Sequence, residues 1–282
     1  MCTLPLLRGI CRECYSEPEA VYDKLKQAGM DLVTVTDHDS IEAGESLGRH
    51  ADFFLSEEVT CRMPSGTTAH IGVYDISERQ HVEIQARRDD LPRLLAYFRE
   101  QDLLCALKHP FSCLTGRRDF ADLHWFRYAF PAWEVVNGHL PDSNNRLAQK
   151  FAVMEGRAPL AGSDAHTLLS VGSTFTVVPR ARTREEFLTG LKEGRGRTGG
   201  EAGSYWKLTR EVLCISGELL SEKPSVWPLA PVTLAIPILT LANYLRELKF
   251  ARLWRDSLER SVPTHGLRRG LDGPLPFQEM NV

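Results

Sequence analysis

The feature that most constrains this chain is the alternation of short β-rich runs with amphipathic helical stretches up to about residue 197. The runs with strand character are residues 32–36, 53–55, 70–74, 103–107, 133–136, 159–161 and 174–178. Strands that alternate with helices are typical of an α/β fold built from β/α units. We therefore predict one α/β domain over residues 1–197.

The composition is that of a soluble globular protein, because 43% of the 282 residues are hydrophobic and 25% are charged. The net charge of −3 gives no general electrostatic reason to expect tight nucleic-acid binding. Seven scattered cysteines and the lack of a signal peptide predict a cytoplasmic protein rather than a disulfide framework. Cys11 and Cys14 form a CxxC without a second pair at zinc-ribbon spacing, so we expect unpaired thiols there.

A glycine-rich segment, residues 194–204, separates the predicted domain from the rest of the chain. Beyond it we predict a helical extension over residues 198–260, with one helix at 205–220 and another continuing to about residue 260. Residues 261–282 are rich in proline, glycine and arginine, and we predict that they form a loose tail.

Residues 227–245 carry no charge over a length close to that of a membrane span, although Pro228, Pro231 and Pro237 interrupt them. We favour a buried helix or a subunit interface, which would make a homodimer through this apolar helix. Contact with a membrane surface and a true span are the alternatives.

Histidines and carboxylates border the strand candidates in a fixed order. These residues are His38 in Asp37-His38-Asp39, Glu58 in Ser56-Glu57-Glu58, His70, His109 in Lys108-His109-Pro110, and Asp164 and His166 in Gly162-Ser163-Asp164-Ala165-His166. In a β/α barrel the carboxyl ends of the strands converge on one face, where active sites are built. A cluster of imidazoles and carboxylates suits Zn²⁺, Mn²⁺ or Fe²⁺ better than Ca²⁺ or Mg²⁺.

With these motifs, which read VTVTDHDS, FLSEEVT, HIGVY, LKHPF, EVVNG and AGSDAH, the chain resembles the PHP (polymerase and histidinol phosphatase) family over residues 15–180. The resemblance implies a distorted (β/α)7 barrel that holds two or three divalent metal ions, with Glu58 bridging them. It implies the metal ligands His38, Glu58, His70, His109, Asp164 and His166, all of which except His70 we also predict to be catalytic. The reaction that it implies is hydrolysis of a phosphate monoester or diester by a metal-activated water.

The family's first motif, HxH on the opening strand, is absent, because no histidine precedes His38. Two explanations are open: the chain begins late, which we favour, or this member has lost one metal site. We therefore predict a barrel that lacks its first strand.

Four further residues are candidates for supporting roles. Asp37 and Asp39 either orient the imidazoles or act as turn and helix N-cap residues. Arg117, next to Arg118, either binds the non-transferred part of a substrate or is merely solvated. Asn137 either touches substrate or holds a loop, and the role of the nearby His139 is open.

The leading interpretation is a metal-dependent phosphoesterase that acts on a small phosphorylated substrate. The alternatives are a hydrolase of the amidohydrolase type, a non-catalytic or metal-impaired module that acts through its C-terminal helices, and a nuclease. Nucleic-acid binding has no support from a basic and aromatic patch.

Overall fold

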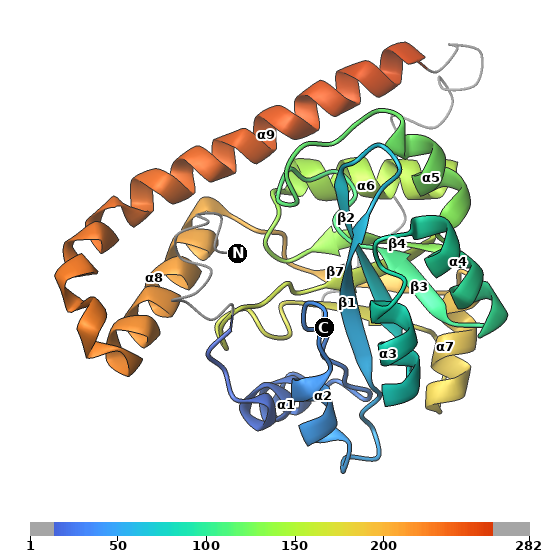
Figure 1. Cartoon of the computed structure of the whole chain (residues 1–282), viewed down its shortest axis with the longest axis horizontal. Helices are drawn as coiled ribbons and strands as arrows, with labels where there is room; N and C mark the ends of the chain where they lie inside the picture. Colours follow the sequence, from blue (N-terminus) through green and yellow to red (C-terminus); the bar gives the residue numbers. More distant parts are fainter. Residues whose placement is uncertain (1–13, 262–282) are drawn as a thin grey trace.

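A five-stranded mixed sheet lies at the centre of the fold in the computed structural model, which describes residues 14–261 (Figure 1). Its strands, in spatial order, are β1 (Ser56–Arg62), β2 (Thr68–Tyr74), β3 (Leu104–Leu107), β4 (Ala132–Asn137) and β5 (Ala158–Gly162). β2 is antiparallel to both β1 and β3, whereas β3, β4 and β5 are parallel to one another. β6 (Thr174–Val177) and β7 (Arg197–Gly200) form a separate antiparallel pair.

Helices connect and cover these strands (Figure 1). Those of the first part of the chain are α1 (Pro18–Gln27), α2 (Glu42–Leu47), α3 (Glu78–Gln85), α4 (Leu91–Glu100), α5 (Asp122–Ala129), α6 (Asp142–Met154) and α7 (Arg184–Lys192). The prediction of an α/β fold is therefore confirmed. The last five strand predictions are also confirmed, each to within two residues at either end.

The expected seven-stranded barrel is not what the described residues form, because their main sheet has five strands and does not close. Residues 32–36 and 53–55, which we predicted as strands, are joined only by an isolated parallel bridge between Val33 and Phe53. The strand that follows them begins at Ser56 instead, because β1 and β2 pair continuously from Ser56–Tyr74 to Arg62–Thr68. Glu58 therefore lies within a strand and not in a turn after one.

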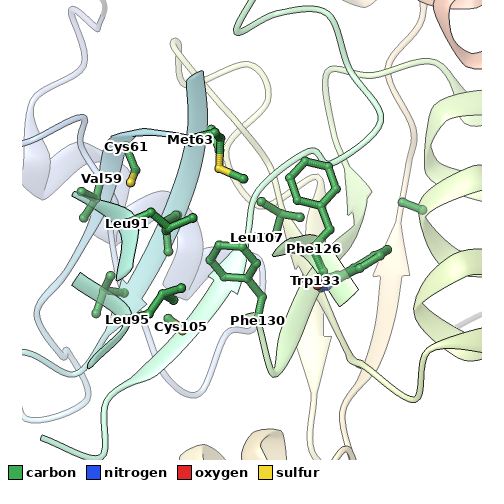
Figure 2. Close-up of a cluster of buried hydrophobic side chains, with 14 of the residues drawn as sticks. Val59, Cys61, Met63, Leu91, Leu95, Cys105, Leu107, Phe126, Phe130 and Trp133 are labelled. Atoms are coloured by element: carbon green, nitrogen blue, oxygen red, sulfur yellow. Dashed lines mark hydrogen bonds between the residues drawn. The ribbon is translucent and has the colours of Figure 1, made fainter. Parts of the chain in front are cut away.

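The largest of three apolar clusters packs between the sheet and the helices α3 to α6, and Figure 2 shows part of it. Fully buried aromatic side chains, among them Phe98, Phe111, Phe126 and Trp133, fill it together with Leu94. Burial of one such side chain contributes roughly 1.5–3 kcal/mol, so this core holds β1 to β4 in place beneath the site described below.

The strand β7 was not predicted, because its sequence, Arg-Thr-Gly-Gly, has neither β-branched alternation nor large side chains. It lies in the glycine-rich segment and begins at the predicted domain boundary. Gly200 adopts a left-handed backbone conformation with φ 110°, which favours glycine. The chain then turns into α8 (Tyr205–Glu222), η2 (Pro224–Ala235) and α9 (Ile236–Ser261), as predicted for a helical extension.

The extension is anchored to the α/β part by a buried carboxylate. Glu247 of α9 accepts hydrogen bonds from Ser112 Oγ (3.2 Å), Cys113 N (3.1 Å) and Asn144 Nδ2 (2.9 Å). Trp254 and Leu258, about two turns and one turn before the end of α9, belong to the main apolar core.

The apolar segment 227–245 is exposed, so the prediction of a buried helix is wrong. Trp227, Leu234 and Ile238 keep 64%, 82% and 72% of their surface exposed. Within the described residues, one helix, 224–260, is long and apolar enough to cross a membrane, and only 11% of its most apolar window is buried. Exposed apolar patches of this kind mark contact surfaces for proteins or membranes, so the dimer and membrane interpretations stay predictions.

Candidate metal centre

Three histidines from different elements meet around one carboxylate oxygen of Glu58. His38 lies in the loop before α2, Glu58 on β1, His70 on β2 and His109 two residues after β3. The distances from Glu58 Oε1 are 2.8 Å to His70 Nδ1, 3.4 Å to His109 Nε2 and 3.9 Å to His38 Nδ1. The structure therefore brings together four of the six predicted metal ligands.

Strand pairing places these residues. His70 lies opposite Thr60, two residues after Glu58 on the same face of the β1–β2 hairpin. Gly72 lies opposite Glu58, and a Cβ there would lie 2.7 Å from Tyr74 Oη and 3.2 Å from Lys108 Cδ. A glycine at this position therefore leaves room for the lysine beneath the cluster.

The backbone is unusual at two of the ligands. His109 and Asp164 have φ angles of 30° and 49°, in the left-handed region that non-glycine residues rarely adopt. Such conformations cost roughly 1–3 kcal/mol and cluster at functional sites.

A buried network lies behind the cluster. Lys108 Nζ is 2.5 Å from Glu134 Oε1 and 4.0 Å from Glu58 Oε2. Glu134 Oε2 accepts hydrogen bonds from His109 N (3.0 Å) and Asn137 Nδ2 (2.9 Å). Asn137 Nδ2 also donates to Asp164 Oδ2 at 3.2 Å, which connects the cluster to the next group of ligands.

Opposite charges fix the ionisation of these buried groups. Burial alone would raise the pKa of Glu58, but hydrogen bonds from His109 and His70 and the charge of Lys108 hold it well below its usual value. Burial would likewise lower the pKa of Lys108, but the charges of Glu134, Tyr74 and Glu58 raise it well above its usual value. The cluster therefore contains a carboxylate and an ammonium group at neutral pH.

A second group consists of His139, Asp164 and His166, whose ligand atoms all lie within 4.8 Å of one another. The rings of His139 and His166 stack with centroids 5.5 Å apart. His166 Nδ1 lies 2.9 Å from the carbonyl oxygen of Asp164, to which it donates, so its Nε2 is left with a free electron pair. Burial would raise the pKa of Asp164, but His166, His139 and His109 lower it to about 2.

The donor sets of both groups fit divalent transition metals. Imidazole nitrogen and carboxylate oxygen are the ligands of Zn²⁺, Mn²⁺ and Fe²⁺ sites. His38 Nδ1 is buried and has no hydrogen-bond partner among residues 14–261, as expected of a nitrogen that has a metal to bind.

A large cavity adjoins the first cluster. Its volume is about 1890 Å³, and it lies between the segment 31–38, α1, α7 and the strands β5 and β6. His38, Glu58, Lys108, Asp164 and His166 line it. A substrate in this cavity would therefore reach both groups of ligands.

The supporting residues proposed from the sequence have different locations. The carbonyl of Asp37 accepts a hydrogen bond from Glu58 N at 3.0 Å. The Asp39 side chain contacts Thr60 N (2.7 Å) and Arg88 Nη1 (2.8 Å), so it secures β1. Asn137 is buried between two carboxylates, which agrees with a holding role.

The two arginines of the loop after β3 differ from each other. Arg117 is exposed and does not line the cavity. Arg118 is buried: it donates to the Thr68 carbonyl at 2.6 Å, and its guanidinium lies over the Phe126 ring. These contacts give no support to a substrate-binding role for Arg117 or Arg118.

Sequence reasoning gave no role to Lys108 or Glu134 and left His139 open. The signals were present, since Lys108 directly precedes His109 and Glu134 lies three residues before Asn137. A charged pair buried on adjacent strands is not visible, however, until the strands are placed side by side.

One family model matches part of the chain. Residues 142–195 match a family described as PHP-associated (PHP_C). No curated protein matches the sequence. The metal roles of the individual residues stay predictions.

Several solved structures resemble the chain. PsfC from Pseudomonas syringae PB-5123 has a TM-score of 0.50 and 19% identity, over 73% of this chain and 89% of PsfC, which shows a shared fold. The lesion-specific endonuclease PfuEndoQ from Pyrococcus furiosus has a TM-score of 0.45 and 17% identity. The match covers 62% of this chain and 50% of the PfuEndoQ chain. An amidohydrolase from Chromobacterium violaceum has a TM-score of 0.43 and 17% identity. The match covers 64% of this chain and 91% of the amidohydrolase chain.

Proposed function

We propose that this chain, whose residues 142–195 match the PHP-associated family, is a PHP-type metal-dependent hydrolase of phosphate esters. The observation that carries the proposal is the convergence of His38, His70 and His109 on one oxygen of Glu58, next to the cavity. The ligands already meet on the open sheet, so the proposal does not depend on a closed seven-stranded barrel.

Two groups of side chains would hold the ions. The first is His38, Glu58, His70 and His109, and the second contains Asp164 and His166. When bound, Zn²⁺, Mn²⁺ or Fe²⁺ supplies Lewis acidity and an activated water for in-line attack on phosphorus.

The residues of the chain support this chemistry in three ways. Glu58 supplies a negative charge that is fixed by its hydrogen bonds to His70 and His109. Lys108 lines the cavity and offsets the growing charge on a phosphoryl oxygen. Asn137 fixes the orientation of Asp164 through its hydrogen bond to Oδ2.

A phosphate monoester or diester fits these residues as substrate class. The cavity of about 1890 Å³ is large enough for a small phosphorylated molecule. We propose a cytoplasmic location, because the seven cysteines are scattered along the sequence rather than spaced as a disulfide framework.

The test is hydrolysis of p-nitrophenyl phosphate and bis(p-nitrophenyl) phosphate with added Mn²⁺ or Zn²⁺. We expect His70→Gln to lower kcat/KM at least ~100-fold, since loss of even a supporting group at a metal site costs 10- to 100-fold. His124→Gln, an exposed histidine on α5, is the matched control and keeps the wild-type rate. Equal rates for wild type and His70→Gln, or a rate that EDTA does not reduce, would contradict the proposal.

A further inference from the structure

One carboxylate of the helical extension is buried without a partner. Glu211 of α8 is 1% exposed, and neither Oε1 nor Oε2 has a hydrogen-bond partner among the described residues. An ionised carboxylate that is buried and unpaired costs several kcal/mol. Lys207, one turn earlier, does not relieve it by a hydrogen bond, because Lys207 Nζ donates to Ser173 Oγ at 2.9 Å.

Glu211 faces the imidazole of His139, which also has a buried nitrogen without a hydrogen-bond partner among the described residues. Glu211 Oε2 lies 3.8 Å from His139 Nε2, which is buried and likewise has no hydrogen-bond partner within residues 14–261. This separation is too long for a hydrogen bond. It is close to the ~3.4 Å that separates two ligands of one tetrahedral Zn²⁺ at about 2.1 Å each.

The backbone before α8 is built to bring Glu211 to this place. Gly203 N donates to the Leu140 carbonyl at 2.8 Å, so the chain passes directly against His139. A Cβ on Gly203 would collide with the His139 carbonyl oxygen, so only glycine allows this approach. Ser204 then caps α8, whose position after β7 Figure 1 shows, and Glu211 follows two turns later.

We propose that Glu211 and His139, with Asp164 and His166, hold a second divalent metal ion. This inference rests on the proposed function, since it completes the second of the two groups of ligands. An ion bound between Glu211 Oε2 and His139 Nε2 would satisfy both buried atoms. The donor set of two imidazoles and two carboxylates suits Zn²⁺ or Mn²⁺.

The consequence is that the helical extension contributes a ligand to the metal centre. Asp164 and His166 follow β5, His139 follows β4, and Glu211 comes from the first helix beyond the predicted domain boundary. Neither Glu211 nor His139 belongs to the motifs from which the other ligands were predicted.

The test measures Zn²⁺ alone, by mass spectrometry of the ions retained per chain and by calorimetric titration of chelator-treated protein. The variants are Glu211→Gln, His139→Gln and the control Glu218→Gln, an exposed carboxylate on the same helix. We expect wild type and Glu218→Gln to bind two ions. Glu211→Gln and His139→Gln lose the second ion or bind it at least ~10-fold more weakly, and retain the first.

Thermal unfolding gives a second signature. In EDTA we expect Glu211→Gln to have a Tm equal to or above that of wild type, because the variant removes a buried charge that has no partner. With Zn²⁺ its rise in Tm is smaller than that of wild type. A carboxylate with a merely structural role would give the opposite order in EDTA.

The outcomes separate this inference from the proposed function. Two ions with unchanged affinity in Glu211→Gln would overturn the inference and leave the proposed function intact. One ion in wild type that Glu58→Gln removes and Glu211→Gln does not would have the same meaning. Wild-type protein that binds no ion would overturn both.

Discussion

Glu57 and Glu58 are neighbours on β1 whose side chains lie on opposite faces of the sheet. Glu57 Oε2 accepts hydrogen bonds from His81 Nδ1 (2.9 Å) and Gln85 Nε2 (2.7 Å) of α3. Glu58 faces His70 and His109 on the other side. Two adjacent carboxylates, both buried, therefore have separate tasks: Glu57 binds a helix to the sheet, and Glu58 belongs to the candidate metal centre.

The first prediction uses this pair as matched variants. Glu58→Gln lowers the rate of phosphate-ester hydrolysis at least ~100-fold, because the amide cannot supply the fixed negative charge between the imidazoles. Glu57→Gln keeps the rate but lowers the free energy of unfolding by about 1–3 kcal/mol, since the acceptor for two donors is changed. Steady-state assays and urea unfolding check both. A rate loss in Glu57→Gln equal to that in Glu58→Gln would refute the division of tasks.

The second prediction concerns Asn137, which shares its amide between Glu134 and Asp164. Asn137→Ala removes the donor from both buried carboxylates, so we expect metal affinity to fall 10- to 100-fold. The free energy of unfolding should fall by about 1–3 kcal/mol in the presence of EDTA. Calorimetric metal titration and urea unfolding measure the two effects. Unchanged metal affinity would show that Asn137 does not orient Asp164.

The third prediction tests how the extension is held. Glu247→Ala leaves Ser112 Oγ, Cys113 N and Asn144 Nδ2 without their buried acceptor, so we expect a loss of stability of about 1–3 kcal/mol or more. Glu259 lies on α9 like Glu247 but forms only an exposed ion pair with Lys150 of α6. Glu259→Ala should therefore lower the free energy of unfolding by less than about 1 kcal/mol. Urea unfolding compares them, and equal effects would contradict the anchoring role of Glu247.

The fourth prediction is a pH dependence near α1. Tyr22 Oη donates to Asp52 Oδ1 at 2.7 Å, and this hydrogen bond, helped by burial and the negative charge of Asp52, raises the pKa of Tyr22 from 10.0 to about 12. Because the folded state holds the phenolic proton more tightly, this contribution to stability is complete below pH 10 and disappears as the pH rises towards about 12.

Tyr22→Phe is the variant that isolates this effect. Wild type should lose more stability than Tyr22→Phe between pH 9 and 12, measured by urea unfolding, because other alkaline titrations are common to both proteins. Parallel losses in the two proteins would show that the hydrogen bond to Asp52 does not hold the proton.

Much of the candidate site could be predicted from sequence because its signals are local. His70 opens the run that becomes β2, and His109 follows the end of β3 by two residues, so each predicted ligand is tied to its strand by a few residues. Choosing Glu58 over Glu57 depended on the family resemblance, since alternation alone allows either residue to face the histidines.

The remaining features depend on contacts between residues far apart in the chain, which leave no periodic pattern. Glu247 meets Cys113 across 134 positions, and nothing in the sequence around either residue signals that contact. Glu211 likewise meets His139 only because Gly203 lets the chain pass close to it. The barrel was expected from the family resemblance, and the three residues 53–55 are too few to distinguish a strand from the approach to β1. Cys11 of the CxxC and residues 262–282 of the predicted tail lie outside the described residues, so the expectations for them stay predictions.

The most direct test of the account is the number of transition-metal ions per chain in protein purified without chelator and without added metal. Mass spectrometry should find two ions in wild type and fewer in Glu58→Gln, with Glu57→Gln equal to wild type. Wild-type protein that contains no transition metal, and takes up none on titration with Zn²⁺ or Mn²⁺, would contradict the central claim that the histidines around Glu58 form a metal centre.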